Sequence, residues 1–132
     1  MTTVFADTFY FIALLNINDE GHAKAVELVP LVERIVTTEW VLTELADGLA
    51  TSRQRAMFVQ TRRILLADEN VEVVPFTMEL YQDGMQMYSA RPDKEWSLTD
   101  CISFVVMQRK GVTEVLTGDH HFEQAGFVAL LK

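Results

Sequence analysis

Short apolar runs alternate along the chain with longer segments in which apolar residues recur at helical spacing. The runs are continuous, which is typical of strands covered by helices on both faces. The expected strands lie at residues 4–6, 35–37, 71–75, 115–117 and 127–131. The expected helices span residues 8–15, 22–29, 40–50, 53–68, 78–90, 97–110 and 120–125. This alternation predicts an α/β fold, a three-layer α/β/α sandwich with a central, mainly parallel sheet.

The length and composition predict one globular domain spanning residues 1–132, since no linker or internal repeat divides the chain. The apolar run at residues 9–15 is shorter than the roughly 20 residues that span a bilayer. No basic residue precedes it, because the first is Lys24, so a secretory signal is not expected. The single cysteine, Cys101, excludes an internal disulfide. We therefore expect a soluble, cytoplasmic protein without a membrane segment.

The net charge changes which partners are expected. Lys and Arg number 11 against 19 Asp and Glu, which gives a net charge of −8. A general electropositive coat for nucleic acid is therefore absent, and any nucleic acid must meet a local basic patch or bound metal ions. Candidate contacts are Arg55 and Arg62, seven residues apart on one expected helix, and Arg91. The alternative is that these arginines belong to an ordinary solvated face.

Acidic residues occur where a parallel sheet binds its ligands, at the carboxyl ends of the strands. Asp7 directly follows the first expected strand, and Asp119 comes two residues after the fourth. Glu44 flanks the apolar side of the helix that follows the second strand. Asp100 lies in the first turn of the helix at 97–110, whose body is apolar on most sides and is expected to be buried. The four acids are therefore expected to converge at one edge.

Each acid also has a structural explanation that leaves chemistry aside. Asp7 and Asp119 are suited to cap the helices that follow them. Asp100 stands three residues after Ser97, the spacing of a capping box. Glu44 is explained as a solvated helix residue. If all four converge, however, each pair about 4 Å apart costs roughly 4 kcal/mol at an effective dielectric near 20, so a cation or protonation must compensate.

Oxygen ligands alone favour a hard ion, Mg²⁺ or Mn²⁺. Zinc is less favoured because Cys101 is the only cysteine in the sequence. His120 and His121 are adjacent in an expected helix, so their side chains are not expected to face the same way. We therefore expect His121 at the surface or at the edge of the core.

The acids lie in four stretches: Val-Phe-Ala-Asp-Thr at 4–8, Thr-Glu-Trp-Val-Leu-Thr-Glu-Leu at 38–45, Trp-Ser-Leu-Thr-Asp-Cys-Ile-Ser-Phe at 96–104, and Leu-Thr-Gly-Asp-His-His-Phe at 116–122. In order and spacing these stretches resemble the four acidic motifs of PIN-domain ribonucleases, above all the VapC-like toxins of bacterial type II toxin–antitoxin systems. The resemblance covers essentially the whole chain. It departs from the family at Gly118, where many relatives carry a polar residue.

The resemblance implies a metal-dependent endoribonuclease in which Mg²⁺ or Mn²⁺ activates a water that attacks an RNA phosphodiester. The residues matching the catalytic and metal-binding acids are Asp7, Glu44, Asp100 and Asp119. Thr8 and Thr117 match hydroxyl residues that orient these acids. The implied partners are an RNA substrate, a small cognate antitoxin and a second copy of the chain, in a homodimer.

Alternatives remain open at this stage. The chain is alternatively a catalytically inactive PIN-like protein-binding module that keeps its acids as helix caps. An antitoxin, instead of RNA, is an alternative partner for the arginines. Trp40 and Trp96 each stand shortly before an acid and could stack on bases, although a core or interface position is the favoured interpretation.

Overall fold

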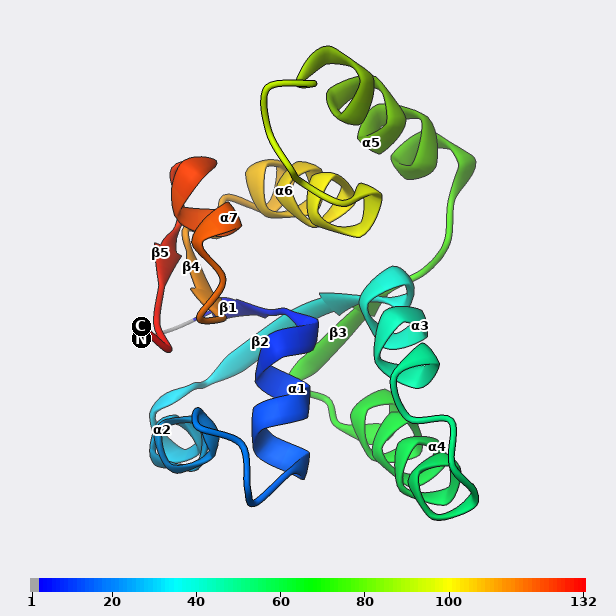
Figure 1. Ribbon diagram of the computed structural model, residues 1–132, viewed down its shortest axis with the longest axis vertical. Helices are drawn as coiled ribbons and strands as arrows, with labels where there is room; N and C mark the ends of the chain where they lie inside the picture. The colour runs from blue at the N-terminus through cyan, green and yellow to red at the C-terminus, as the bar shows by residue number, and fades with distance from the viewer. Residues whose placement is uncertain (1–2) are drawn as a thin grey trace.

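The structure is a computed structural model that describes residues 3–132, and its centre is a sheet of parallel strands (Figure 1). The order across the sheet is β3-β2-β1-β4-β5, and every neighbouring pair is parallel. The strands are β1 (Thr3–Ala6), β2 (Arg34–Thr38), β3 (Val71–Val74), β4 (Glu114–Leu116) and β5 (Val128–Ala129). The predicted parallel α/β sandwich is confirmed.

Helices fill the connections as predicted. They are α1 (Thr8–Leu15), α2 (His22–Leu28), α3 (Glu39–Asp47), α4 (Ser52–Ala67), α5 (Met78–Ala90), α6 (Leu98–Lys110) and α7 (His120–Gln124), with a short 3-10 turn, η1 (Val29–Leu31), after α2. Within residues 3–132, none of these helices is long and apolar enough to cross a membrane.

Two elements end two or more residues away from the prediction, and every other boundary agrees within one residue. The helix expected at 40–50 ends at Asp47, because the backbone turns at Gly48 and leaves residues 49–50 outside. The last strand is shorter than residues 127–131, because it lies at the sheet edge and pairs only with β4. The backbone N–H groups of Leu130 and Leu131 still donate to carbonyls on or just after β4.

The connections place the point where the strand order reverses between β1 and β4. From β1 the chain runs outward through β2 to β3, and then crosses to β4 on the other side of β1. Consequently α5, α6 and α7 lie above the sheet in Figure 1, while α1, α2 and α4 lie below it. In open parallel sheets ligands bind where the strand order reverses in this way, at the carboxyl ends of the strands. Here that point lies between the ends of β1 and β4.

Packing of α5, α6 and α7 fixes the helix starts that follow this edge of the sheet. Gly84 in α5 lies against Ile102 of α6, where a Cβ would overlap the Ile102 side chain, so glycine permits the close approach of the two helices. Phe104 of α6 packs edge-on against Trp96 and against Phe122, with ring centroids 5.0 Å apart in both pairs. The starts of α6 and α7 are thereby held in place relative to each other.

Candidate metal-binding active site

Asp7 lies at the end of β1 and is only 5% exposed. It stands at the N-cap position of α1, but its side chain makes no capping hydrogen bond to the helix. Instead its Oδ2 accepts a hydrogen bond of 3.0 Å from the hydroxyl of Thr117, at the end of β4. The simple capping explanation therefore does not account for Asp7.

Glu44 reaches this point from α3. The hydroxyl of Thr8, the residue after Asp7, donates a hydrogen bond of 2.5 Å to Glu44 Oε1. The charge of Glu44 is close enough to contribute to the raised pKa of Asp7. Thr8 therefore holds the second acid beside the first, across 36 residues of sequence.

Asp100 does form the capping box that its spacing with Ser97 predicts. The Ser97 hydroxyl accepts from the Asp100 N–H at 3.0 Å, and Asp100 Oδ2 accepts from the Ser97 N–H at 3.1 Å. The same Oδ2 atom also lies 3.0 Å from His121 Nδ1, and Asp100 is only 7% exposed. Capping and membership of the acidic cluster therefore coexist in one carboxylate.

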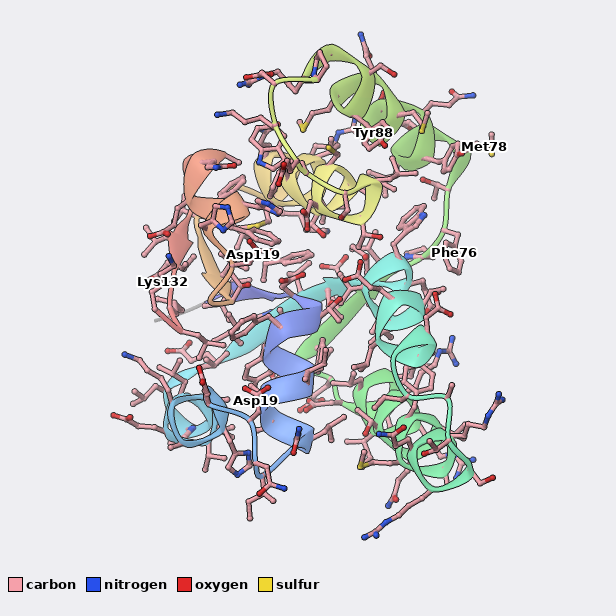
Figure 2. All side chains as sticks on the ribbon, in the orientation of Figure 1. Asp19, Phe76, Met78, Tyr88, Asp119 and Lys132 are labelled. Atoms are coloured by element: carbon pink, nitrogen blue, oxygen red, sulfur yellow. The ribbon has the colours of Figure 1, made fainter. Side chains whose placement is uncertain are left out.

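Asp119 caps the short helix α7, as its position predicts, since Oδ1 accepts from the His121 N–H at 2.9 Å. The Asp119 N–H in turn donates to the Thr117 hydroxyl at 3.1 Å. Because the Thr117 hydroxyl also donates to Asp7, one buried threonine connects the acids that follow β1 and β4. Figure 2 labels Asp119 at the start of α7.

His121 is the residue that the sequence reasoning missed. Its Nδ1 lies 3.0 Å from Asp100 Oδ2 and 3.4 Å from Asp119 Oδ2, so the imidazole bridges two acids. Since a carboxylate oxygen accepts, Nδ1 is the donor in this geometry. The edge position expected for His121 agrees with its half-buried side chain. The available signal was its place in the first turn, where its own N–H contacts the capping carboxylate.

The expectation that His120 and His121 face apart is wrong. Their ring centroids are 4.5 Å apart, and ligand atoms of Asp119, His120 and His121 lie within 4.8 Å of one another. Spacing rules describe the body of a helix, whereas α7 has only five residues and both histidines occupy its first turn. Imidazole nitrogen is therefore available at the rim of the carboxylate cluster.

The cluster carries uncompensated negative charge. Burial, followed by the nearby charge of Asp100, raises the pKa of Asp7 to about 7. Burial also raises the pKa of Asp100 above its ordinary value, with Asp119 adding to the rise and bonds to Ser97 and His121 opposing it. Within residues 3–132, no Lys or Arg forms a salt bridge with these acids or with Glu44. Closely spaced carboxylates without Lys or Arg partners fit a hard divalent cation.

The candidate RNA-contacting arginines lie outside this cluster, and each already contacts protein. Arg62 pairs with Glu39 at 2.7 Å. Arg55 Nε donates to a backbone carbonyl at 2.7 Å. Arg91 makes two bonds of 3.0 Å to Asp93. Arg55 and Arg62 lie on α4, which packs on α3 and β3.

The tryptophans follow the favoured interpretation. Trp96 is buried in the core, and its Nε1–H donates to Gln124 Oε1 at 3.0 Å. Trp40 is half-buried and packs edge-on against Phe76, with ring centroids 5.0 Å apart.

Gly118, where the sequence departs from the family pattern, lies against the partly exposed ring of Phe9. A Cβ at this position would lie 2.6 Å from Cζ of Phe9, so the phenyl ring occupies the space that a side chain would need.

A parallel sheet with linked acids at the carboxyl ends of β1 and β4 is the arrangement that the PIN-domain resemblance implies. The family model described as PIN domain matches residues 4–128, and the chain therefore belongs to the PIN-domain family. This confirms the resemblance seen in the sequence.

The relatives show which PIN-domain proteins the chain is similar to. The 23S rRNA-specific endonuclease VapC20 of Mycobacterium tuberculosis is 30% identical over 126 residues, which cover 95% of both chains. The crystal structure of M. tuberculosis VapC20, described as a sarcin-ricin loop cleaving toxin, matches with a TM-score of 0.86 at 28% identity, covering 95% of this chain and 96% of that one. VapBC-1 from nontypeable Haemophilus influenzae shares the fold, with a TM-score of 0.66 at 16% identity and complete coverage of both chains.

Proposed function

We propose that this chain is an Mg²⁺- or Mn²⁺-dependent endoribonuclease and the toxin of a toxin–antitoxin pair. The observation that carries the proposal is the linked cluster of Asp7, Glu44, Asp100 and Asp119, which come from four separate segments and have no Lys or Arg partner within residues 3–132. VapC20, a 23S rRNA-specific endonuclease, supports RNA as the substrate class. The sarcin-ricin loop is the first RNA to test.

The four carboxylates would hold the ion, with Asp7 and Asp100 as the buried pair. A bound divalent ion supplies an activated water and neutralises charge on the phosphoryl oxygens. The protein's own contribution is orientation. Thr8 fixes one oxygen of Glu44, and Thr117 fixes Oδ2 of Asp7, so both carboxylates are directed before any ligand arrives.

We assign His121 the role of a positioning residue. Its Nδ1–H donates to Asp100 Oδ2, and the same atom is 3.4 Å from Asp119. This geometry keeps two like charges at a defined separation, while the other oxygen of Asp100 remains free of this bond. The imidazole therefore does for Asp100 what Thr117 does for Asp7.

The test uses a synthetic hairpin RNA carrying the sarcin-ricin loop, and total RNA in parallel. The wild-type protein with Mn²⁺ is expected to cut at one defined site, and to cut nothing after chelation with EDTA. Asp7→Asn and Asp100→Asn variants that cut as fast as the wild type would contradict the proposal. The inactive-module alternative predicts neither cleavage nor Mn²⁺ binding.

We infer an antitoxin and a second copy of the chain as partners. Complexes of VapBC type among proteins of similar fold support an antitoxin. The helix α4 also supports one, because it has no buried residue and exposes Val59, Ile64 and Leu66. Phe76 and Met78 are exposed at the start of α5, project outward in Figure 2 and supply apolar surface for a homodimer. Light scattering after gel filtration, alone and with the antitoxin, tests both partners.

Two further expectations belong to the proposal. Residues 1–132 form one domain, because β1 and β5, from opposite ends of the chain, lie in one sheet. The protein acts in the cytoplasm, where ribosomal RNA is found.

The arginines Arg55, Arg62 and Arg91 remain proposed RNA contacts, with the antitoxin as the alternative partner. Binding of RNA and antitoxin to single alanine variants separates the two.

A further inference from the structure

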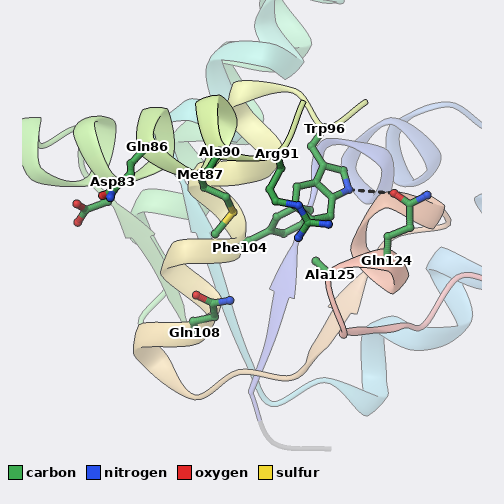
Figure 3. Close-up of a pocket in the computed structure, with 10 residues that line it drawn as sticks. All are labelled: Asp83, Gln86, Met87, Ala90, Arg91, Trp96, Phe104, Gln108, Gln124 and Ala125. Carbon is green, nitrogen blue, oxygen red and sulfur yellow. Dashed lines mark hydrogen bonds between the residues drawn. The ribbon is translucent and has the colours of Figure 1, made fainter. Parts of the chain in front are cut away.

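A cavity lies between α5, α6 and α7 (Figure 3). Its volume is about 480 Å³, within the range of small-molecule sites. The residues that matter to its chemistry are Gln86, Arg91, Trp96, Phe104, Gln108 and Gln124. We call this cavity the Trp96 pocket.

The polar lining of the Trp96 pocket is mostly neutral amide. Gln124 uses its Oε1 to accept from Trp96, which leaves its NH₂ group to donate elsewhere. Within residues 3–132, the side-chain amides of Gln86 and Gln108 make no hydrogen bond, and both residues are exposed. An amide offers a donor and an acceptor side by side, which matches the hydrogen-bonding edge of a nucleobase.

The charges of the pocket disfavour a phosphate. Arg91 is its cation, and that guanidinium is already paired with Asp93 and lies 5.1 Å from the centroid of the Trp96 ring. Asp83 also lines the cavity and pairs with Arg109. A neutral planar group suits this environment, because a guanidinium plane stacks on aromatic rings without needing a negative charge.

Two of the three helices around the pocket, α6 and α7, also position acids of the cluster. Phe104 lies one turn after Asp100 on α6, roughly 6 Å along the helix axis. Gln124 lies at the other end of the short helix that Asp119 caps. The bond between Trp96 and Gln124 therefore joins the two segments that carry these acids.

We propose that the Trp96 pocket binds an unpaired nucleobase of the RNA substrate, next to the scissile phosphodiester. The base stacks on the guanidinium plane of Arg91, and the glutamine amides bond to its edge. The proposal rests on the proposed function, since it concerns the same RNA, and it adds a specificity-determining site to it. Single-stranded RNA is commonly recognised in this way, through splayed bases on aromatic or arginine planes.

The first test needs no cleavage. The chain has only two tryptophans, so their indole N–H signals are separable by NMR while adenosine, guanosine, cytidine and uridine are added one at a time. We expect one nucleoside to shift the Trp96 signal saturably and to leave the Trp40 signal unchanged. Gln108→Ala should weaken this binding at least fivefold, whereas the exposed Gln60→Ala on α4 should not. Equal movement of both indoles, or of neither, overturns the proposal.

The second test is a double-mutant cycle on the hairpin RNA with single abasic positions in the loop. For the wild type, one abasic position should raise KM about tenfold, and for Gln108→Ala the same position should add little. Ala90→Trp, which fills the pocket, should raise KM similarly. Strictly additive losses overturn the pocket while leaving nuclease activity intact. Nucleoside binding without any RNA cleavage instead overturns the proposed function and supports the pocket.

Discussion

The acidic cluster and the α4 face differ in what the fold leaves unsatisfied, which is buried charge in the first and exposed apolar surface in the second. At the cluster, Asp7 and Asp100 are almost fully buried and held by hydrogen bonds, yet no Lys or Arg within residues 3–132 pairs with them. On α4, all sixteen residues escape full burial, and apolar Val59, Ile64 and Leu66 face solvent. The first region has charge without a counter-charge, and the second has apolar surface without cover. Each therefore points to a different missing partner, an ion and a protein.

The largest expected effect comes from removing one acid. Asp7→Asn and Asp100→Asn should each lower single-turnover cleavage of the hairpin RNA about 10³-fold or more, since several kcal/mol of charge stabilisation are lost and each 1.4 kcal/mol is tenfold. Asp47→Asn, an exposed carboxylate at the end of α3, is the matched control and should cut normally. An equal loss of cleavage rate in all three variants would contradict the distinction between the cluster and ordinary surface acids.

The raised pKa of Asp7 predicts that metal-free protein loses stability as pH rises. Between pH 4 and its folded-state pKa of about 7, Asp7 keeps its proton in the folded state and has lost it in the unfolded chain. The free energy of unfolding should therefore fall across this window, by up to about 4 kcal/mol for a shift of three units. Urea unfolding in EDTA at several pH values measures the fall. Asp7→Asn should flatten the profile, and an unchanged slope in that variant would contradict the explanation.

Divalent metal should reverse this loss. Mn²⁺ at about 100 times its dissociation constant should raise the free energy of unfolding by about 2.7 kcal/mol at pH 8. The gain should shrink at pH 5, where protons compete for the carboxylates. Thermal melts with Mn²⁺ and with EDTA measure it. Asp100→Asn serves as the comparison, and a full Mn²⁺ response in that variant would place the ion elsewhere.

The positions of the acids followed from chain order, because strand ends and helix starts fix where a carboxylate lies. Asp7 and Asp119 stand beside adjacent strands, and Asp100 opens a helix whose apolar body required burial. The position of Glu44 could be predicted from the apolar stripe of its helix, which it flanks. These features depend on the backbone path, which hydrophobic periodicity predicts well.

Features set by side-chain rotamers or by packing between helices did not follow from the sequence. The bridging position of His121 depends on its rotamer in the first turn of α7, which spacing rules do not describe. The Trp96 pocket depends on how closely α5 approaches α6, which a buried Gly84 decides. In the sequence, the apolar residues of α4 form an ordinary amphipathic pattern. Only the structure shows that this apolar face is left exposed.

A smaller effect is expected from His121, which separates orientation of the acids from their charge. His121→Ala should lower cleavage about 10- to 100-fold and weaken Mn²⁺ binding, since residues that orient metal ligands commonly contribute this much. His121→Asn, whose side-chain NH₂ can replace the Nδ1–H donor, should restore most of both. His22→Ala is the control, because His22 lies on α2 and its Nδ1 contacts the backbone carbonyl of Ala13. A purely structural role for His121 would lower thermal stability in both variants without this rescue of Mn²⁺ affinity.

The smallest effect on the isolated chain is expected on α4, where the comparison is sharpest. Val59→Glu and Leu66→Glu should change the free energy of unfolding by no more than about 0.5 kcal/mol, because neither side chain is buried. By contrast, Leu45→Ala in the buried face of α3 should cost about 2–5 kcal/mol. Both α4 variants should still cut RNA but lose affinity for the antitoxin, which calorimetry with the co-expressed partner measures. If the α4 variants instead lose more than 1 kcal/mol of unfolding free energy and bind the antitoxin unchanged, this face stabilises the fold. Only the acidic cluster would then be a binding site.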